Sequence, residues 1–263
     1  MDMKGMKARD VMSRDVITID KDSSIERAKA FMEKHGITKI PVTEAGELIG
    51  VISDEELVDK LGSIRTRMVA PSALHVSSVM LKEFKAVNIE DPVKGIVERA
   101  KERGVALFPV LEENRLCGVI TKSDLLPFVE SNASVESVMT SPVHVAAPDD
   151  RIAHARRLMV DNGIERLPVL RGGMLSGIIS AMDIALFLYD FRMHVEAKHQ
   201  QARLENALVE HAMKLEVFSI EKSASVKEAA EIMYRENIGC LPVIGHVRKI
   251  EGIVSRTDLI KTI

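Results

Sequence analysis

The sequence contains no tryptophan, and aromatic residues make up only 3% of its 263 residues. Proteins that bind single-stranded nucleic acid stack the bases on aromatic side chains, so the composition disfavours this function. The formal net charge is −3, whereas binding to a phosphate backbone requires an excess of basic residues. We therefore predict that nucleic acid is not a partner of this protein.

Cysteine is scarce as well, since Cys117 and Cys240 are the two in the chain and they form no CxxC motif. A chain of this size with two cysteines lacks a disulfide framework, which is typical of a reducing compartment. No apolar run approaches the roughly 20 residues that a membrane-spanning helix needs. The first residues lack the apolar core of a signal peptide. We expect a cytoplasmic protein that does not contact a membrane.

Motifs of common catalytic sites are missing from the sequence. It has no GxxxxGK[ST] phosphate loop, no HExxH zinc motif and no GxSxG nucleophile motif. The eight histidines are scattered along the chain. We predict no enzymatic activity, no catalytic cofactor and no metal. Hydrophobic residues make up 46% of the chain and charged residues 29%, the balance of a globular protein with a sizeable core.

The main feature of the sequence is a fourfold repeat. Each copy has an apolar–Met pair, a β-branched residue thirteen positions later, a Pro sixteen further on, and a Gly nine or ten beyond that. A hydroxyl residue and then an acid follow at intervals of three. A fixed period of this kind indicates a tandem array of one supersecondary unit. The pairs are Val11–Met12, Val79–Met80, Val138–Met139 and Ala212–Met213, and the glycines are Gly50, Gly118, Gly177 and Gly252.

The landmarks predict a βαββα unit, and hence an α/β (α+β) fold. In the first copy we expect a strand over 16–19, a Ser23–Glu26 capping box, and a helix with Ile25, Ala28 and Met32 on its buried face. In the second copy, Asp91–Pro92 should start the helix. Glycines 36, 104 and 163 are expected left-handed helix caps. A strand with Pro at its start or edge, a strand over 48–53 and a second helix follow.

The hydroxyl residue and the acid fall at the start of the second helix of each copy. They are Ser53 with Glu56, Thr121 with Asp124, Ser180 with Asp183, and Ser255 with Asp258. One interpretation is a capping box, in which the pair satisfies the helix N-terminus. The other is a ligand site, because a carboxylate beside a hydroxyl accepts charge-assisted hydrogen bonds from the vicinal diol of a ribose. Spacing alone leaves both interpretations open.

The apolar–Met start, the apolar–Pro–Val strand and the Gly-to-acid segment together resemble CBS domains over essentially the whole chain. The resemblance implies that repeats pair into Bateman modules with a ligand cleft between paired repeats. From linker lengths we expect one module over 1–130 (repeats about 8–62 and 75–130) and another over 131–263 (repeats about 134–190 and 208–263). A four-copy chain without a catalytic domain is similar to the gamma subunit of AMP-activated protein kinase and its archaeal relatives.

The resemblance also implies roles for individual residues. The hydroxyl–acid pairs would bind ribose, with the site of Glu56 weak or altered because the other copies have Asp. The base would lie against residues of the first and second strands, and phosphate would be held by basic side chains. The base candidates are Thr18, Ile40, Pro41, Phe108, Pro109, Val145, Leu167, Pro168, Ser219, Leu241 and Pro242, and the phosphate candidates are Lys39, Lys122, Arg166 and Arg256.

The predicted function is that of a regulatory sensor that binds AMP, ADP or ATP and signals to an unknown protein partner by a conformational change. One alternative is a sensor of S-adenosylmethionine or methylthioadenosine, and another is a scaffold with empty clefts. A long polar helical pattern over 184–213 would add a surface or a homodimer contact.

Overall fold

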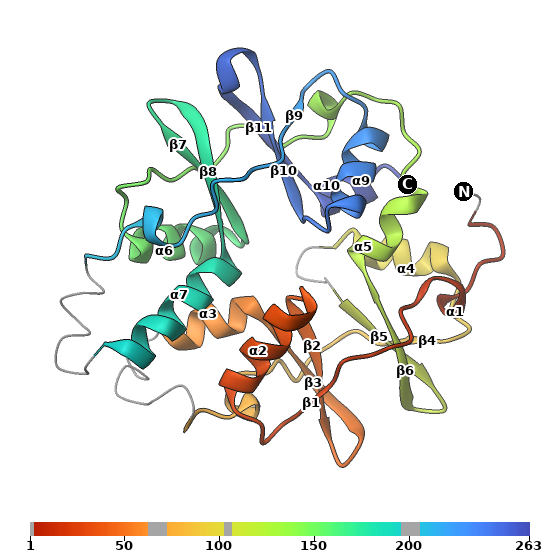
Figure 1. Cartoon of the computed structure of the whole chain (residues 1–263). Coiled ribbons are helices and arrows are strands. Elements are labelled where there is room, and N and C mark those ends of the chain that lie inside the picture. The colour runs from red at the N-terminus through yellow and green to blue at the C-terminus, as the bar shows by residue number, and fades with distance from the viewer. Residues whose placement is uncertain (1–2, 63–72, 103–106, 196–205) are drawn as a thin grey trace. The chain divides into compact units, whose positions relative to one another are not determined.

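The computed structural model describes residues 3–62, 73–102, 107–195 and 206–263 (Figure 1). Four repeats of helix and β-hairpin follow one another along the chain. The elements of the first two repeats are β1 (Ile19–Asp20), α2 (Ile25–His35), β2 (Lys39–Glu44), β3 (Glu47–Ser53), α3 (Asp54–Gly62), β4 (Val87–Asn88), α4 (Val93–Ala100), β5 (Leu107–Glu112), β6 (Arg115–Thr121) and α5 (Lys122–Leu125). Those of the last two are α6 (Ile152–Asn162), β7 (Arg166–Arg171), β8 (Met174–Ser180), α7 (Ala181–His194), β9 (Ile220–Glu221), α9 (Val226–Arg235), β10 (Cys240–Ile244), β11 (Ile250–Ser255) and α10 (Arg256–Ile260).

The sheet of each repeat has one pattern, which confirms the predicted α+β fold of four βαββα-like units. A short first strand runs parallel to the second strand, and the second is antiparallel to the third, as in β1–β2–β3. In the third repeat the first strand is reduced to a single parallel bridge between Ala146 and Val169. The predicted strand over 16–19 is wrong in its bounds, because β1 begins at Ile19, where pairing with Val42 begins.

The prolines of the second strands lie inside their strands and not at a start, and in three of the four repeats that strand is the central one of its sheet. Pro41 is the third residue of β2, which is flanked by both other strands. However, β1 pairs only with Val42 and Thr43, so β2 has a free side at Pro41. A proline lacks the N–H that a ladder requires. The short first strand therefore makes the proline compatible with a central strand.

The first helices bury the predicted stripes. Ile25, Ala28 and Met32 are all buried, as are the residues at the same positions of the other three helices. Gly36 (φ 62°) and Gly163 (φ 58°) are the expected left-handed caps, and residue 104 lies outside the described residues. These equivalent helices therefore have equivalent packing, as the repeat predicted.

Two predicted helix starts are wrong by one residue. Ser24, and not Ser23, is the N-cap of α2, and its side chain accepts from the Arg27 amide at 3.2 Å. Pro92 is the N-cap of α4, and the carboxylate of Asp91 instead accepts from the amide of Asn88. In both cases the helix begins at the β-branched landmark of the repeat, Ile25 or Val93.

The predicted long helix over 184–213 is only partly correct. Helix α7 ends at His194, and residues 196–205 lie outside the described part of the chain. Beyond them, Leu208 is extended and Val209–His211 form one turn of 3₁₀-helix. The amide of Val209 bonds the carbonyl of Asp150, and its side chain is buried. Tertiary contacts with the third repeat thus replace helix at the end of this segment.

Two compact units divide the chain, and each combines separate segments. The first unit comprises Met1–Val16, Phe84–Val143 and Phe218–Ile263, and the second comprises Ile17–Glu83 and His144–Val217. The first unit therefore holds the hairpins of the second and fourth repeats, and the second unit holds those of the first and third. Within the second unit, helix α3 packs against α7, and the two share one hydrophobic core. The predicted modules over 1–130 and 131–263 stay a prediction.

The apolar–Met starts pack on a repeat other than their own. In the first unit, Ser13 forms a β-bridge with Val119, so that Met12 lies against Gly118 of the second repeat. In the second unit, Leu81 bridges Val51, and Met80 lies against Gly50 of the first repeat. Met139 and Met213 contact Gly252 and Gly177 in the same way. The Met and Gly landmarks of the sequence are thus contact partners.

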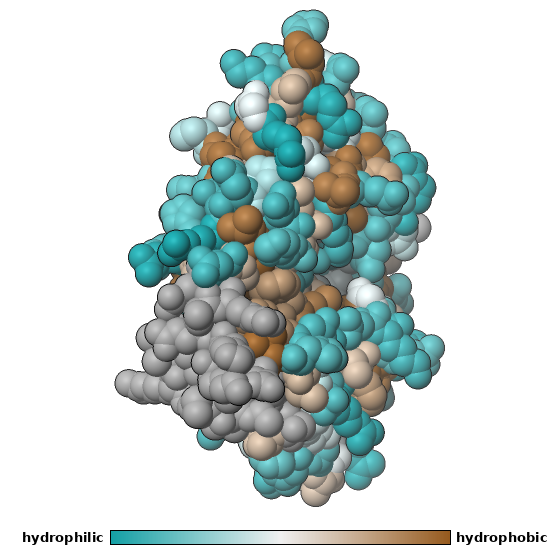
Figure 2. All heavy atoms as spheres, turned by 60° about the vertical axis from the view of Figure 1, so that its left-hand side comes forward, coloured by the Kyte–Doolittle hydropathy of each residue, from teal (hydrophilic) through white to brown (hydrophobic). Residues whose placement is uncertain are grey.

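Polar side chains cover most of the face drawn in Figure 2, and apolar side chains form smaller patches between them. Among the described residues, no helix combines the length and the apolar character needed to cross a membrane.

Candidate ligand-binding site

The hydroxyl–acid pairs form the N-terminal caps of the second helices. In each of three repeats, one carboxylate oxygen, Oδ2, accepts from both the amide and the hydroxyl of the cap residue. The two distances are 2.7 and 2.7 Å for Asp124 with Thr121, 2.8 and 2.5 Å for Asp183 with Ser180, and 3.0 and 2.6 Å for Asp258 with Ser255. The cap therefore uses one oxygen of each aspartate and leaves the other, Oδ1, for different partners.

The first repeat keeps the same cap with a longer acid. Glu56 accepts from the amide of Ser53 at 3.0 Å and also from its hydroxyl. Ser53 is buried, with 5% of its surface exposed. The additional methylene of Glu56 is thus compatible with capping, and a weaker or altered ligand site in this repeat stays a prediction.

The second oxygens of the aspartates meet weak partners. Asp183 Oδ1 lies 3.2 Å from the ammonium of Lys214, and Asp258 Oδ1 lies 3.7 Å from that of Lys261. Both lysine side chains are exposed, at 68% for Lys214 and 53% for Lys261, so they can move away from the aspartates into solvent. Among the described residues, Oδ1 of Asp124 has no hydrogen-bond partner. A ligand hydroxyl can therefore replace these partners at little cost.

Asp183 also lines a pocket of about 290 Å³ in the second unit. The pocket is bordered by α7 and the segment before Met213. Its lining residues are Asp183, Leu186, Phe187, Asp190, Phe191, His211 and Ala212. The volume is at the lower end of small-molecule sites. None of the predicted base residues lines this pocket, so the structure does not bring them together with Asp183 there.

The predicted base residues divide into buried and partly exposed ones. Ile40, Phe108, Leu167 and Leu241 have no exposed surface and belong to the hydrophobic cores, and the four prolines beside them are buried as well. The described structure gives these side chains a packing role. Thr18, Val145 and Ser219 are partly exposed, so a ligand can reach them. Contact of any of these residues with a base stays a prediction.

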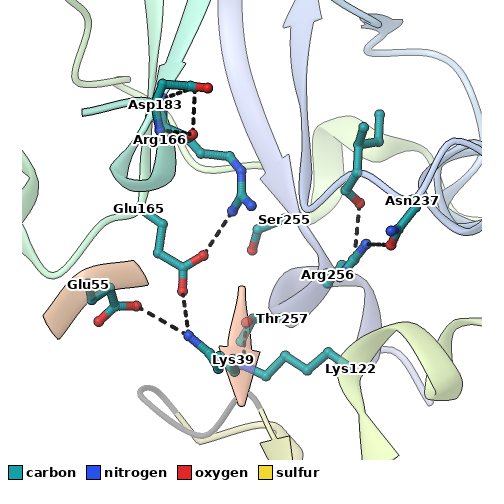
Figure 3. Close-up of polar contacts among 12 residues, drawn as sticks. Lys39, Glu55, Lys122, Glu165, Arg166, Asp183, Asn237, Ser255, Arg256 and Thr257 are labelled. Atoms are coloured by element: carbon teal, nitrogen blue, oxygen red, sulfur yellow. Dashed lines mark hydrogen bonds and ion pairs between the residues drawn. The ribbon is translucent and has the colours of Figure 1, made fainter. Parts of the chain in front are cut away.

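Two of the predicted phosphate residues, Lys39 and Arg166, lie together in the second unit (Figure 3). They come from the equivalent strands β2 and β7. Both contact carboxylates: Glu165 lies 3.7 Å from Lys39 and 2.8 Å from Arg166, and Glu55 lies 3.7 Å from Lys39. Glu55 and Glu165 were not predicted from the sequence as neighbours of these cations. The signal was present, because Glu165 directly precedes Arg166 and Glu55 directly precedes Glu56.

A third carboxylate, Asp54, is buried beside this group. It is the first residue of α3, its amide donates to the carbonyl of Thr38 at 3.0 Å, and only 1% of its surface is exposed. Its Oδ1 has no hydrogen-bond partner among the described residues. Burial raises the pKa of Asp54 to about 6, because desolvation disfavours the charged form. The charge of Glu165 adds to this effect, and Lys39 and Arg166 oppose it.

Glu55 and Glu165 are neighbouring carboxyl groups, since each lies 3.7 Å from the ammonium of Lys39. Half of the Glu55 side chain is exposed, but partial desolvation and the neighbouring Glu165 raise its pKa. Desolvation alone would also raise the pKa of Glu165, but the charges of Lys39 and Arg166, which Glu165 contacts, lower it. Two carboxyl groups in contact share one proton, and the pair titrates as a unit.

The other two phosphate candidates, Lys122 and Arg256, lie in the first unit and begin α5 and α10. The ammonium of Lys122 donates to the hydroxyl of Thr257 at 2.7 Å, which connects the second and fourth repeats. The guanidinium of Arg256 donates to the carbonyl of Ile238 at 3.0 Å and to the side chain of Asn237 at 3.1 Å. In the first unit, Lys122 and Arg256 thus donate to hydroxyl and amide oxygens. In the second unit, Lys39 and Arg166 contact carboxylates (Figure 3).

Metal ligands are not gathered at these sites. Within the described ranges, no three His, Cys, Asp or Glu side chains form a group that could hold a metal ion.

Comparison with known proteins gives four matches to one family. The family is described as the CBS domain, and it matches residues 8–63, 76–131, 135–190 and 209–263. Protein MJ1225 of Methanocaldococcus jannaschii is 28% identical over 267 residues, which cover 95% of each chain. A 33.4 kDa protein of Thermofilum pendens is 28% identical over 246 residues, which cover 87% of this chain and 81% of that one.

Solved structures also cover the whole chain. The crystal structure of MJ1225, described as a proposed archaeal homologue of the γ subunit of AMP-activated protein kinase, has a TM-score of 0.85 at 26% identity and covers 97% of this chain and 99% of that one. A protein of Pyrococcus horikoshii has a TM-score of 0.61 at 19% identity with the same coverage. The second likeness shows the fold alone.

Proposed function

This chain belongs to the CBS-domain family, and on that premise we propose that it is a regulatory protein that binds an adenine nucleotide. The carboxylates of Asp124, Asp183 and Asp258 hold the ribose, and a partner protein responds to the bound state. The observation that supports this proposal is the division of labour within each carboxylate. Oδ2 is used by the helix cap, and Oδ1 is available to a ribose hydroxyl or is held by an exposed lysine.

Capping and ribose binding are compatible in this geometry. A carboxylate has two oxygens and about four acceptor positions. The cap also fixes the carboxylate in one orientation, which lowers the entropy that a ligand loses on binding. The two interpretations left open by the sequence therefore become one site with two functions. The whole-chain likeness to MJ1225, described as a proposed archaeal homologue of the γ subunit of AMP-activated protein kinase, supports a regulatory role.

The first test is calorimetric titration of the purified chain with AMP, ADP, ATP and S-adenosylmethionine. We expect a Kd on the order of micromolar to millimolar for at least one adenine nucleotide. The matched variant combines Asp124→Asn, Asp183→Asn and Asp258→Asn, because asparagine keeps an acceptor for the cap and removes the negative charge. A hydrogen bond to a charged group contributes about 1.5–3 kcal/mol, so affinity should fall by roughly tenfold or more. Unchanged affinity in the folded variant would contradict the ribose role.

A second candidate is an adenosyl ligand without phosphate, such as S-adenosylmethionine or methylthioadenosine. One observation favours this candidate: Glu165 contacts both predicted phosphate residues of the second unit, Lys39 and Arg166. The same titration separates the candidates, because only a ligand with phosphate should lose affinity when Lys122 or Arg256 is replaced by Ala. If the protein binds none of the four ligands, its clefts are structural or hold a ligand of another class. The partner, a homodimer and a cytoplasmic location stay predictions.

A further inference from the structure

The group formed by Lys39, Arg166, Asp54, Glu55 and Glu165 contains more negative than positive side chains. Two cations face three carboxyl groups, and Glu56, which caps α3, also interacts with the charge of Lys39. Burial alone would lower the pKa of Lys39, but the charges of Glu165, Asp54, Glu55 and Glu56 raise it. When all of these carboxyl groups are ionised, their negative charge therefore repels a phosphate that approaches Lys39 and Arg166.

The carboxyl groups of this cluster do not all favour ionisation. Asp54 is almost wholly buried, and one of its oxygens has no partner among the described residues, so its charged form is poorly solvated. Glu55 and Glu165 both lie 3.7 Å from Lys39, and the proximity of two carboxyl groups disfavours the ionised form of Glu55, whose pKa is raised. Taking up protons at Asp54 and Glu55 removes two of the negative charges around Lys39 and Arg166.

We propose that Asp54, Glu55 and Glu165 make Lys39 and Arg166 a proton-gated anion site, which accepts a ligand phosphate when the carboxyl cluster is protonated. This inference rests on the proposed function and concerns the regulation of its site in the second unit. Both cations come from equivalent strands of the first and third repeats, and Glu165 and Glu55 come from different repeats as well. Proton uptake at this cluster thus affects contacts that join two repeats.

The physical consequence is linkage between phosphate and protons. A phosphate beside Lys39 and Arg166 adds negative charge next to the carboxyl groups, and like charge favours their protonated forms. Binding and protonation must then promote each other, because linkage is reciprocal. Phosphate binding should take up protons near neutral pH, and its affinity should rise as the pH falls. An adenosine without phosphate should bind without this dependence.

The test uses the full chain with Asp124→Asn and Asp258→Asn, which leaves the ribose aspartate of the second unit. AMP and adenosine are titrated calorimetrically at about pH 6 and about pH 8, in two buffers that differ in ionisation enthalpy. We expect AMP to bind about tenfold or more tightly at the lower pH, with proton uptake. Adenosine should bind with the same affinity at both pH values, without proton uptake.

Two variants in the same background test the cluster itself. Glu55→Gln and Asp54→Asn remove carboxyl groups while keeping side-chain size, so AMP should bind at about pH 8 nearly as tightly as the parent does at about pH 6. Thermal unfolding of both variants establishes that they are folded, and Glu165→Gln serves as a third variant with the same expectation if either fails to fold.

The outcomes distinguish this inference from the proposed function. If AMP and adenosine bind but the affinity for AMP is independent of pH, or if the variants retain its full pH dependence, the proton gate is wrong and the adenine site stands. An equal pH dependence for adenosine also overturns the gate. If neither ligand binds at either pH, and none binds the parent chain, the proposed function and this inference are both wrong.

Discussion

Gly177 of β8 and Met213 are contact partners in the second unit. A Cβ atom at Gly177 would lie 3.1 Å from the sulfur of Met213 and 2.8 Å from the carbonyl oxygen of Lys214. Gly50 has the same relationship with Met80 and the carbonyl of Leu81, at 3.1 and 2.7 Å. Space for a methionine and for an adjacent backbone bridge therefore explains why a glycine is required at this point of the hairpin.

Gly177→Ala should destabilise the protein by about 1–3 kcal/mol, the usual cost of inserting an atom into a packed contact. The backbone carbonyl of Lys214 cannot move away without breaking its bridge to Ile178. Chemical denaturation of parent and variant measures the difference. Gly95→Ala is the matched control, because Gly95 lies inside α4 and a Cβ there meets nothing closer than 3.9 Å. Gly95→Ala should stabilise the protein by about 0.5–1 kcal/mol. Equal effects of the two substitutions on the free energy of unfolding would contradict the packing explanation.

Asp54→Asn should stabilise the folded chain at alkaline pH and do so less in acid. The folded-state pKa of Asp54 is raised from 3.8 to about 6. The contribution of Asp54 to stability is therefore fully present below its unfolded-state pKa, and it is lost as the pH rises through its folded-state pKa. The benefit of asparagine should grow by roughly 1–3 kcal/mol between about pH 4 and about pH 7. Urea unfolding over this pH range measures it. Asp15→Asn, at an exposed position, should show no such growth.

Ser180→Ala should lower the free energy of unfolding by about 1 kcal/mol, the usual effect of removing an N-cap side chain. The hydroxyl of Ser180 accepts from the amide of Asp183 at 3.1 Å and donates to its carboxylate. Its loss also frees the orientation of that carboxylate, so adenine-nucleotide affinity should fall too. Ser223→Ala at an exposed position should change stability by less than about 0.5 kcal/mol. A stable Ser180→Ala protein would show that the cap is dispensable.

Lys214→Ala should leave ribose binding intact or improve it, whereas Asp183→Asn should weaken it. The lysine side chain is exposed and contacts Asp183 Oδ1, the oxygen proposed for the ligand. Asp183 keeps its hydrogen bonds to Ser180 in this variant, so the chain should stay folded. Calorimetric titration and denaturation of both variants decide the matter. A large loss of affinity in Lys214→Ala would mean that the lysine itself binds the ligand.

Much of the fold was predictable because it depends on local chemistry. The buried stripe of Ile25, Ala28 and Met32 follows from helical periodicity, and the left-handed cap at Gly36 follows from the conformational freedom of glycine. The Ser180–Asp183 box was predictable for the same reason, since the two residues are three apart on one turn. At Ser23 the prediction failed because the neighbouring Ser24 is an equally good cap by type. At Asp91 it failed because the side chain accepts from the amide of Asn88 instead.

The sequence by itself determined the repeat, its βαββα order and the caps that hold the candidate aspartates, since these depend on residues close together in the chain. Tertiary structure alone decided that Met213 packs on Gly177, that α7 is not continued to residue 213, and that Glu165 pairs with Lys39. These contacts join residues from different repeats. Their geometry depends on burial and on the charges of neighbours, which spacing along one chain does not contain.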